Sequence, residues 1–91
     1  MAINELYQTI LERKNHPAES SYTASLFTQG LPRMAQKVGE EGTEVVVAAL
    51  AQDNARLIEE IADLTYHVLV LMAAKGLAPE DIAKELEKRR K

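Results

Sequence analysis

The chain has 91 residues, a net charge of −3 and 46% hydrophobic residues, which is the composition of one small globular domain over residues 1–91. Its negative charge gives no electrostatic footprint for nucleic acid, and no apolar run approaches the length of a membrane span. Without cysteine, the chain has no disulfide framework and no zinc–thiolate site. Asn4 and Glu5 interrupt the start of the chain, which does not resemble a signal peptide, and we expect a cytoplasmic protein.

A first amphipathic helix is predicted by apolar residues at helical spacing, namely Ile3, Leu6, Tyr7, Ile10 and Leu11. A loop over residues 18–22 follows, and then a short helix that closes at Gly30. Three hydroxyl side chains near the start of this short helix could cap it: Ser20, Ser21 and Thr23. Such hydroxyls usually serve as caps, and binding of a phosphate or ribose is the less frequent alternative.

Two long helices follow, separated by a break at residues 52–54. Pro32 fits the first turn of the first long helix. Asp53 or Asn54 caps the second, which ends at Gly76, and Pro79 starts a last helix. The chain is therefore predicted to be all-α, with a central helical hairpin.

The first long helix carries three carboxylates in one turn, those of Glu40, Glu41 and Glu44. Glu41 lies within about 60° of the apolar residues of this helix, where the pattern calls for a core residue. Glu60 and Asp63 share one face of the next helix. In an antiparallel hairpin the two acidic turns lie roughly 16 Å and 13 Å from the connection, at ~1.5 Å per residue, and therefore at similar heights.

Four carboxylates, those of Glu41, Glu44, Glu60 and Asp63, are thus predicted to face each other in an apolar groove. They would repel one another and lose hydration, and the usual compensation is a bound divalent cation. Ligands that are all oxygen favour Mg²⁺, Mn²⁺ or Ca²⁺ over zinc. The alternative is that both acidic turns are solvated helix faces, but their matched heights and the position of Glu41 favour a site.

Basic residues and a histidine flank the acids. Lys37 is within reach of Glu41 and its neighbours, and Arg33 lies one turn earlier. These cations either form ordinary intrahelical ion pairs or hold a phosphate beside the metal site. His67 could assist a metal-bound water or a substrate, although a lone histidine on a half-buried helix is more often structural.

Two glycines lie inside the first long helix, where each costs about 1 kcal/mol relative to alanine. The cost of Gly39 and Gly42 suggests that another backbone or a ligand approaches closely, unless both are merely tolerated.

Two runs carry no polar face, residues 45–51 and residues 68–74. A helix that is apolar all round is buried all round, and one chain of short helices cannot cover both runs completely. We therefore expect a homodimer in which the two hairpins pack as a four-helix-bundle core.

The acidic pattern, Glu40-Glu41-x-x-Glu44 and then Glu60-x-x-Asp63, resembles the MazG-like all-α nucleotide pyrophosphatases. Within them the resemblance is closest to the phosphoribosyl-ATP pyrophosphatase family of histidine biosynthesis, and it covers nearly the whole chain. The residues that carry it are Ser21-Tyr22-Thr23, Lys37-Val38-Gly39-Glu40-Glu41, Glu44 and Ala62-Asp63-Leu64-x-Tyr66-His67. One departure is Gly42, where the family pattern predicts alanine, and it concerns helix stability more than chemistry.

The resemblance implies hydrolysis of phosphoribosyl-ATP to phosphoribosyl-AMP and pyrophosphate, by attack of water at the α-phosphorus. It implies that Mg²⁺, or Mn²⁺ as a substitute, is held by Glu41, Glu44, Glu60 and Asp63. Glu40 would orient or deprotonate the water, and Lys37 and Arg33 would hold phosphate oxygens. The remaining substrate contacts would come from Ser21, Tyr22, Thr23 and His67.

Two other functions fit parts of the pattern. A general nucleotide triphosphate pyrophosphatase that removes non-standard nucleotides shares the metal site, but gives no reason for the Ser-Tyr-Thr element. A non-enzymatic helical dimerisation module would leave the acids solvated. Titration with Mg²⁺ or Mn²⁺ separates the module from both enzymes.

Overall fold

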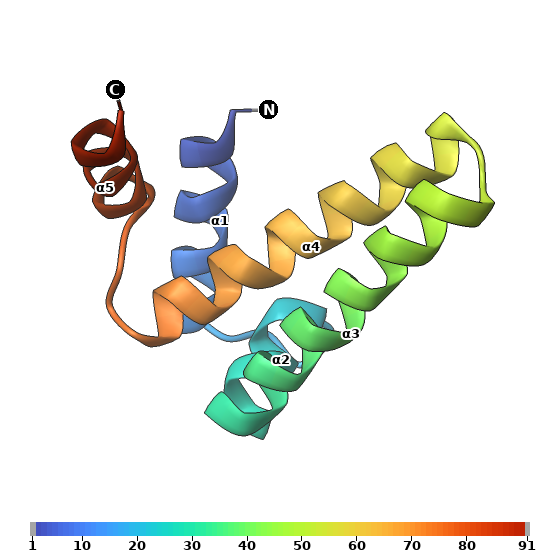
Figure 1. Cartoon of the computed structure of the whole chain (residues 1–91). Helices are drawn as coiled ribbons and strands as arrows, with labels where there is room; N and C mark the ends of the chain where they lie inside the picture. Colours follow the sequence, from blue (N-terminus) through green and yellow to red (C-terminus); the bar gives the residue numbers. More distant parts are fainter. Residues whose placement is uncertain (1, 91) are drawn as a thin grey trace.

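The computed structural model describes residues 2–90, which form five helices and no strand. The helices are α1 (Ile3–Asn15), α2 (Tyr22–Gln29), α3 (Leu31–Ala51), α4 (Asn54–Ala74) and α5 (Pro79–Arg89). The all-α prediction is confirmed. The helices α3 and α4 form an antiparallel hairpin, and the three shorter helices gather at its open end (Figure 1). None of the helices in residues 2–90 combines the length and the hydrophobicity that crossing a bilayer demands.

The predicted helix ends follow local chemistry. Ser21 Oγ and Asp53 Oδ1 accept backbone N–H groups from the first turns of α2 and α4, at 3.1 and 2.9 Å. Gly30 and Gly76 have φ angles of 95° and 74°, a region that favours glycine because other side chains clash there. Ser21 and Asp53 are therefore the caps among the candidates that the sequence offered.

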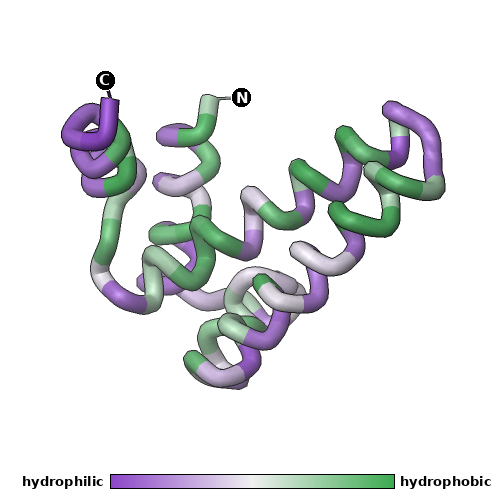
Figure 2. Tube along the Cα trace, viewed as in Figure 1, coloured by the Kyte–Doolittle hydropathy of each residue, from purple (hydrophilic) through white to green (hydrophobic). Residues whose placement is uncertain are grey.

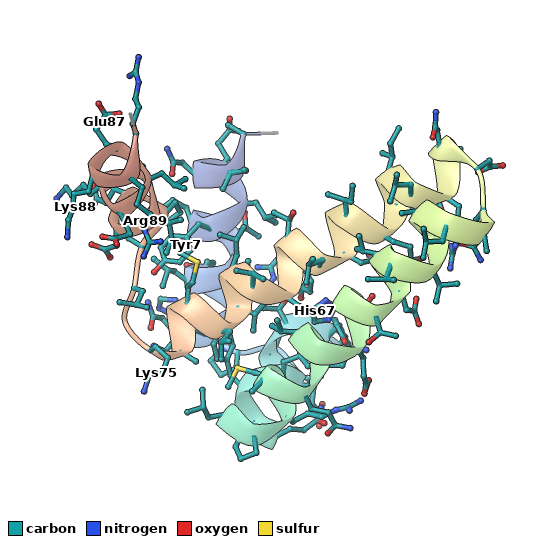
Figure 3. The ribbon with its side chains drawn as sticks, in the orientation of Figure 1. Tyr7, His67, Lys75, Glu87, Lys88 and Arg89 are labelled. Atoms are coloured by element: carbon teal, nitrogen blue, oxygen red, sulfur yellow. The ribbon has the colours of Figure 1, made fainter. Side chains whose placement is uncertain are left out.

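The core lies where α1 and α2 pack against the open end of the hairpin. Its buried members are Tyr7, Ile10, Leu26, Met34, Leu69, Val70, Met72 and Ala73. The hydroxyl of Tyr7 donates to the carbonyl oxygen of Leu77 and so ties α1 to the connection before α5 (Figure 3). Residues 68–74 thus lie in or against the core of the single chain, with four of the seven buried and the other three partly buried.

The other apolar run, residues 45–51, is largely exposed near the connection between α3 and α4. Figure 2 shows hydrophobic residues on both helices of this part of the hairpin. We call the exposed apolar side chains here the tip patch: Val46, Val47, Leu50, Ile58 and Ile61. Leu50 has the most exposed of these side chains, at 83%. Of the two runs that the sequence singled out, the chain therefore covers one and leaves the other open.

Nothing else in residues 2–90 approaches the glycines inside α3 closely. A Cβ atom added at Gly39 or Gly42 would find nothing within 4 Å among the residues that the structure describes. The close approach of a second backbone, which the sequence suggested as one alternative, is therefore not found in the part of the chain that the structure describes.

We expect Gly42→Ala to raise the free energy of unfolding by about 1 kcal/mol, because alanine restricts the unfolded chain and meets no clash in the helix. Gly39→Ala is the matched variant, three residues away on the same helix and more exposed. Urea unfolding of the metal-free protein measures both. A loss of stability or association at Gly42 alone would show that a partner subunit or ligand approaches this face.

Candidate metal centre

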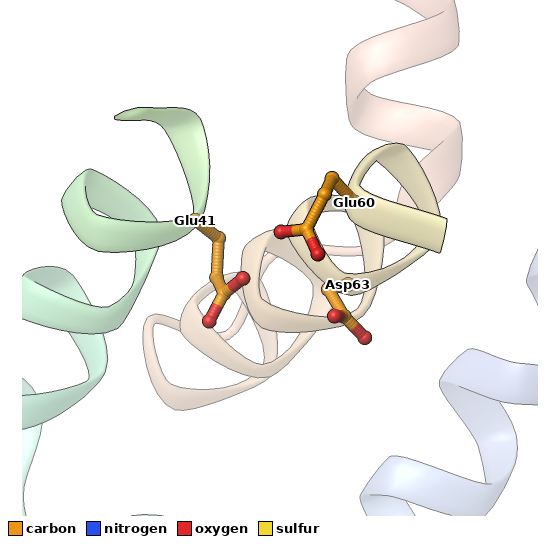
Figure 4. A group of neighbouring side chains, drawn as sticks. All are labelled: Glu41, Glu60 and Asp63. Atoms are coloured by element: carbon orange, nitrogen blue, oxygen red, sulfur yellow. The ribbon is translucent and has the colours of Figure 1, made fainter. Parts of the chain in front are cut away.

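Three carboxylates meet in the groove between α3 and α4. One oxygen each of Glu41, Glu60 and Asp63 lies within 4.8 Å of the other two (Figure 4). Glu41 comes from α3, and the other two come from consecutive turns of α4. Three hard oxygen donors so close together could bind one divalent ion after small side-chain adjustments.

Two of these acids are buried. Glu41 is 8% exposed and Glu60 is 2% exposed, whereas Asp63 faces solvent. The core position that the sequence predicted for Glu41 is confirmed. Within residues 2–90, the buried Oε2 atom of Glu60 has no hydrogen-bond partner. An unpartnered carboxylate oxygen in the interior is costly, so a cation between these acids fits the site.

Glu44, the fourth predicted ligand, is exposed and stands outside the three-acid group, but it lies beside Glu60. The pKa of Glu60 is raised, first by its interaction with the neighbouring carboxyl group of Glu44 and then by burial. The charges of Glu44 and Asp63 raise it further, and Arg56 opposes them. All four predicted acids therefore lie close together, with three of them within reach of one ion.

The cations of α3 pair with its acids. Lys37 Nζ lies 3.2 Å from Glu41 Oε1 and 4.0 Å from Glu40 Oε2, and Arg33 Nη1 lies 3.3 Å from Glu40 Oε1. Burial would lower the pKa of Lys37, but the hydrogen bond with Glu41 and nearby negative charge outweigh it and raise the pKa. Lys37 is therefore a fixed cation at the edge of the acid cluster.

Arg56 is a site residue that the sequence analysis did not single out. Its Nη2 atom lies 2.8 Å from Glu60 Oε1, and its Nη1 atom lies 2.9 Å from Glu59 Oε2. The spacing of four residues between Arg56 and Glu60, the same as between Lys37 and Glu41, was the signal that could have found it.

His67 joins α2 to α4 beside the acids (Figure 3). Because a carbonyl oxygen can only accept, Nδ1–H of His67 donates to the backbone oxygen of Asp63, at 2.8 Å. Nε2 then accepts the hydroxyl of Tyr22 at 3.1 Å. The side chain is buried and both ring nitrogens are used, so His67 supports the turn that carries Asp63.

The Ser-Tyr-Thr element packs onto the same part of α4. Ser21 caps α2, and the hydroxyl of Thr23 forms a hydrogen bond with the hydroxyl of Tyr66. The rings of Tyr22 and Tyr66 are stacked, with centroids 6.3 Å apart. Tyr22 is nevertheless 53% exposed, so it is the member of this element with the most surface open to a ligand.

Comparisons with known proteins identify the family of the chain. A family model described as phosphoribosyl-ATP pyrophosphohydrolase matches residues 3–90. A phosphoribosyl-ATP pyrophosphatase of Saccharolobus solfataricus is 53% identical over 89 residues, which are 98% of this chain and 95% of the relative. One of Clostridium botulinum is 52% identical over 88 residues, which are 97% of this chain and 80% of the relative. The chain belongs to the phosphoribosyl-ATP pyrophosphohydrolase family.

Proposed function

We propose that the chain hydrolyses phosphoribosyl-ATP to phosphoribosyl-AMP and pyrophosphate, an early step of histidine biosynthesis. The observation that carries this proposal is the match over residues 3–90 to a family of that activity. The acid cluster supports it, because solvated helix faces do not bury two carboxylates such as those of Glu41 and Glu60. An enzyme of amino-acid biosynthesis works on cytoplasmic metabolites, so we place it in the cytoplasm.

Glu41, Glu60 and Asp63 would hold Mg²⁺, or Mn²⁺ as a substitute, with Glu44 as a fourth ligand. The unpartnered Oε2 of Glu60 among residues 2–90 and the purely oxygen donor set support this choice. When bound, the ion neutralises charge on the leaving pyrophosphate. In the absence of the ion the acids repel one another, and the raised pKa of Glu60 beside Glu44 is consistent with this repulsion.

The residues of α3 act on the water and on the phosphates. Water attacks the α-phosphorus, the bond to the bridging oxygen of the β-phosphate breaks, and pyrophosphate leaves. Glu40 orients this water and accepts its proton, and its half-buried carboxylate is held ready by Arg33 and Lys37. When the substrate binds, Arg33 and Lys37 give up part of their contact with the carboxylates and contact phosphate oxygens instead.

The Ser-Tyr-Thr element and His67 bind the nucleoside end of the substrate. Ser21, Thr23 and His67 already use their polar atoms in hydrogen bonds within the chain. We therefore assign them the role of holding Tyr22 in position. The exposed ring of Tyr22 makes the direct contact. This arrangement supports recognition of the nucleoside end of the substrate in addition to its triphosphate. A general nucleotide triphosphate pyrophosphatase would not need such recognition.

The products of the reaction test the proposal. Phosphorus NMR with inorganic pyrophosphatase excluded should show intact pyrophosphate and phosphoribosyl-AMP as primary products. In ¹⁸O-labelled water, the label should enter phosphoribosyl-AMP and not pyrophosphate. Orthophosphate with a diphosphate product would refute cleavage at the α-phosphorus. Equal turnover of ordinary nucleotide triphosphates would leave the mechanism intact and refute the substrate assignment.

We also propose that the enzyme is a homodimer in which the two hairpins pack as a four-helix bundle. The tip patch supports this, because it offers apolar side chains from both α3 and α4 that the single chain leaves exposed. The acids occupy the same hairpin, so association would also fix the spacing of the two helices that carry the site.

A further inference from the structure

Each buried acid of the site has a cation four residues earlier on its own helix. Lys37 Nζ lies 3.2 Å from Glu41 Oε1, and Arg56 Nη2 lies 2.8 Å from Glu60 Oε1. A cation that precedes its acid by four residues has the weaker orientation for stabilising a helix. The repeated arrangement on α3 and α4 therefore calls for an explanation other than helix stability.

The guanidinium of Arg56 is held in place from both sides. Its Nη1 atom contacts Glu59, its Nη2 atom contacts Glu60, and its backbone N–H is fixed by the Asp53 cap at the start of α4. One hydrogen bond, to Glu59, and one ion pair, to Glu60, restrict both the position and the orientation of this planar group.

Arg56 uses only one oxygen of Glu60. The other, Oε2, is buried and lacks a hydrogen-bond partner anywhere in the described part of the chain. Figure 4 shows the carboxylate of Glu60 directed from α4 into the space between Glu41 and Asp63. The guanidinium and a metal ion can thus contact Glu60 at the same time, through different oxygens.

The rest of the surroundings of Glu60 are negative. Glu44 and Asp63 lie near it, and across residues 2–90 Arg56 is its only ion-pair partner. Without Arg56, repulsion from Glu44 and Asp63 would favour other rotamers of Glu60, or movement of its carboxylate away from the cluster.

We propose that Arg56 is a positioning residue, which holds Oε1 of Glu60 so that Oε2 is presented to the metal ion. The inference rests on the proposed metal dependence, and it adds a residue to which neither the sequence motifs nor the family match gives a role. Ligating carboxylates need hydrogen-bonded partners that fix them, and loss of such a partner typically weakens metal binding by about 10- to 100-fold.

Direct titration of Mn²⁺ into the substrate-free protein tests this, by calorimetry or by the loss of the free-ion EPR signal. Arg56→Gln should weaken Mn²⁺ binding by about 10- to 100-fold. Arg56→Lys should recover part of the affinity, because it keeps the charge and loses the second contact. Unfolding of each metal-free variant, followed by circular dichroism, should remain cooperative and close to that of the wild type.

Two control variants separate position from charge. Glu80→Gln removes an exposed carboxylate of α5 and changes the net charge by one unit away from the acids. Arg89→Gln breaks the contact with Glu85, an i,i+4 pair on α5 away from the acids. Both should bind Mn²⁺ as the wild type does.

The outcomes distinguish this inference from the proposed function. If Arg56→Gln binds Mn²⁺ as tightly as the wild type, or more tightly, Arg56 is only a counterion that competes with the metal, and the inference fails. A wild type without Mn²⁺ binding also overturns it. If the wild type binds Mn²⁺ and Arg56→Gln binds it weakly, the role of Arg56 stands even if phosphoribosyl-ATP proves not to be the substrate.

Discussion

Asp63→Asn and Glu41→Gln should each lower the turnover of phosphoribosyl-ATP by about 10³-fold or more, while both proteins remain folded. A bound ion supplies several kcal/mol of charge stabilisation in the transition state, and about 4 kcal/mol corresponds to this factor. Each substitution keeps the size of the side chain and replaces an anionic ligand by a neutral amide. Initial rates across a Mg²⁺ series and far-ultraviolet circular dichroism measure the two effects.

Glu80→Gln is the control, since it removes an exposed carboxylate of α5 outside the three-acid cluster. It should retain near wild-type turnover. If both cluster variants keep their metal-dependent activity, the metal ligands have been placed wrongly. If they lose helical signal as well, their carboxylates are needed for the fold, and the loss of turnover would not identify a metal site.

The positions of the acids could be predicted because they follow from helix geometry. Glu41 falls on the apolar side of α3, and the antiparallel hairpin brings Glu60 and Asp63 to its height. The rise and the periodicity of an α-helix, together with the antiparallel connection, are enough to predict these positions without knowledge of the tertiary packing. The helix ends at Asp53 and Gly76 were predictable for the same reason, since capping is local chemistry.

Side-chain partners depend on tertiary packing and could not be predicted in the same way. Ser21, Tyr22 and Thr23 looked alike as hydroxyl donors in the sequence. The cap formed by Ser21 is local, but only the docking of α2 against α4 makes Tyr22 a hydrogen-bond partner of His67 and Thr23 a partner of Tyr66. The exposed position of Glu44 likewise depends on the rotation of α3 about its axis, which the packing of neighbouring helices fixes.

The two apolar runs show the same limit. Residues 45–51 and 68–74 have the same polarity pattern, yet the chain buries most of the second and exposes most of the first. The difference arises because α1 packs against the end of α4 and no helix of the described chain covers the tip of the hairpin. Composition alone does not say which run a neighbouring helix will reach.

Val70→Asp should therefore unfold the protein, whereas Val47→Asp should leave each subunit folded and weaken the dimer. Val70 is 1% exposed in the core, and a carboxylate buried there without a partner costs more than about 4 kcal/mol, a large part of the stability of a small domain. Val47 is 49% exposed in the tip patch, where a charge is solvated in the free subunit and becomes buried only on association.

Circular dichroism and sedimentation equilibrium, measured over a range of protein concentrations, separate the two effects. Val70→Asp should lose most of its cooperative unfolding transition. Val47→Asp should keep the transition and sediment as a monomer at concentrations where the wild type is a dimer. Glu80→Gln on the exposed face of α5 is a control that should change neither quantity. A wild type that is a stable monomer at micromolar concentration would refute the dimer, and the tip patch would then need a different partner.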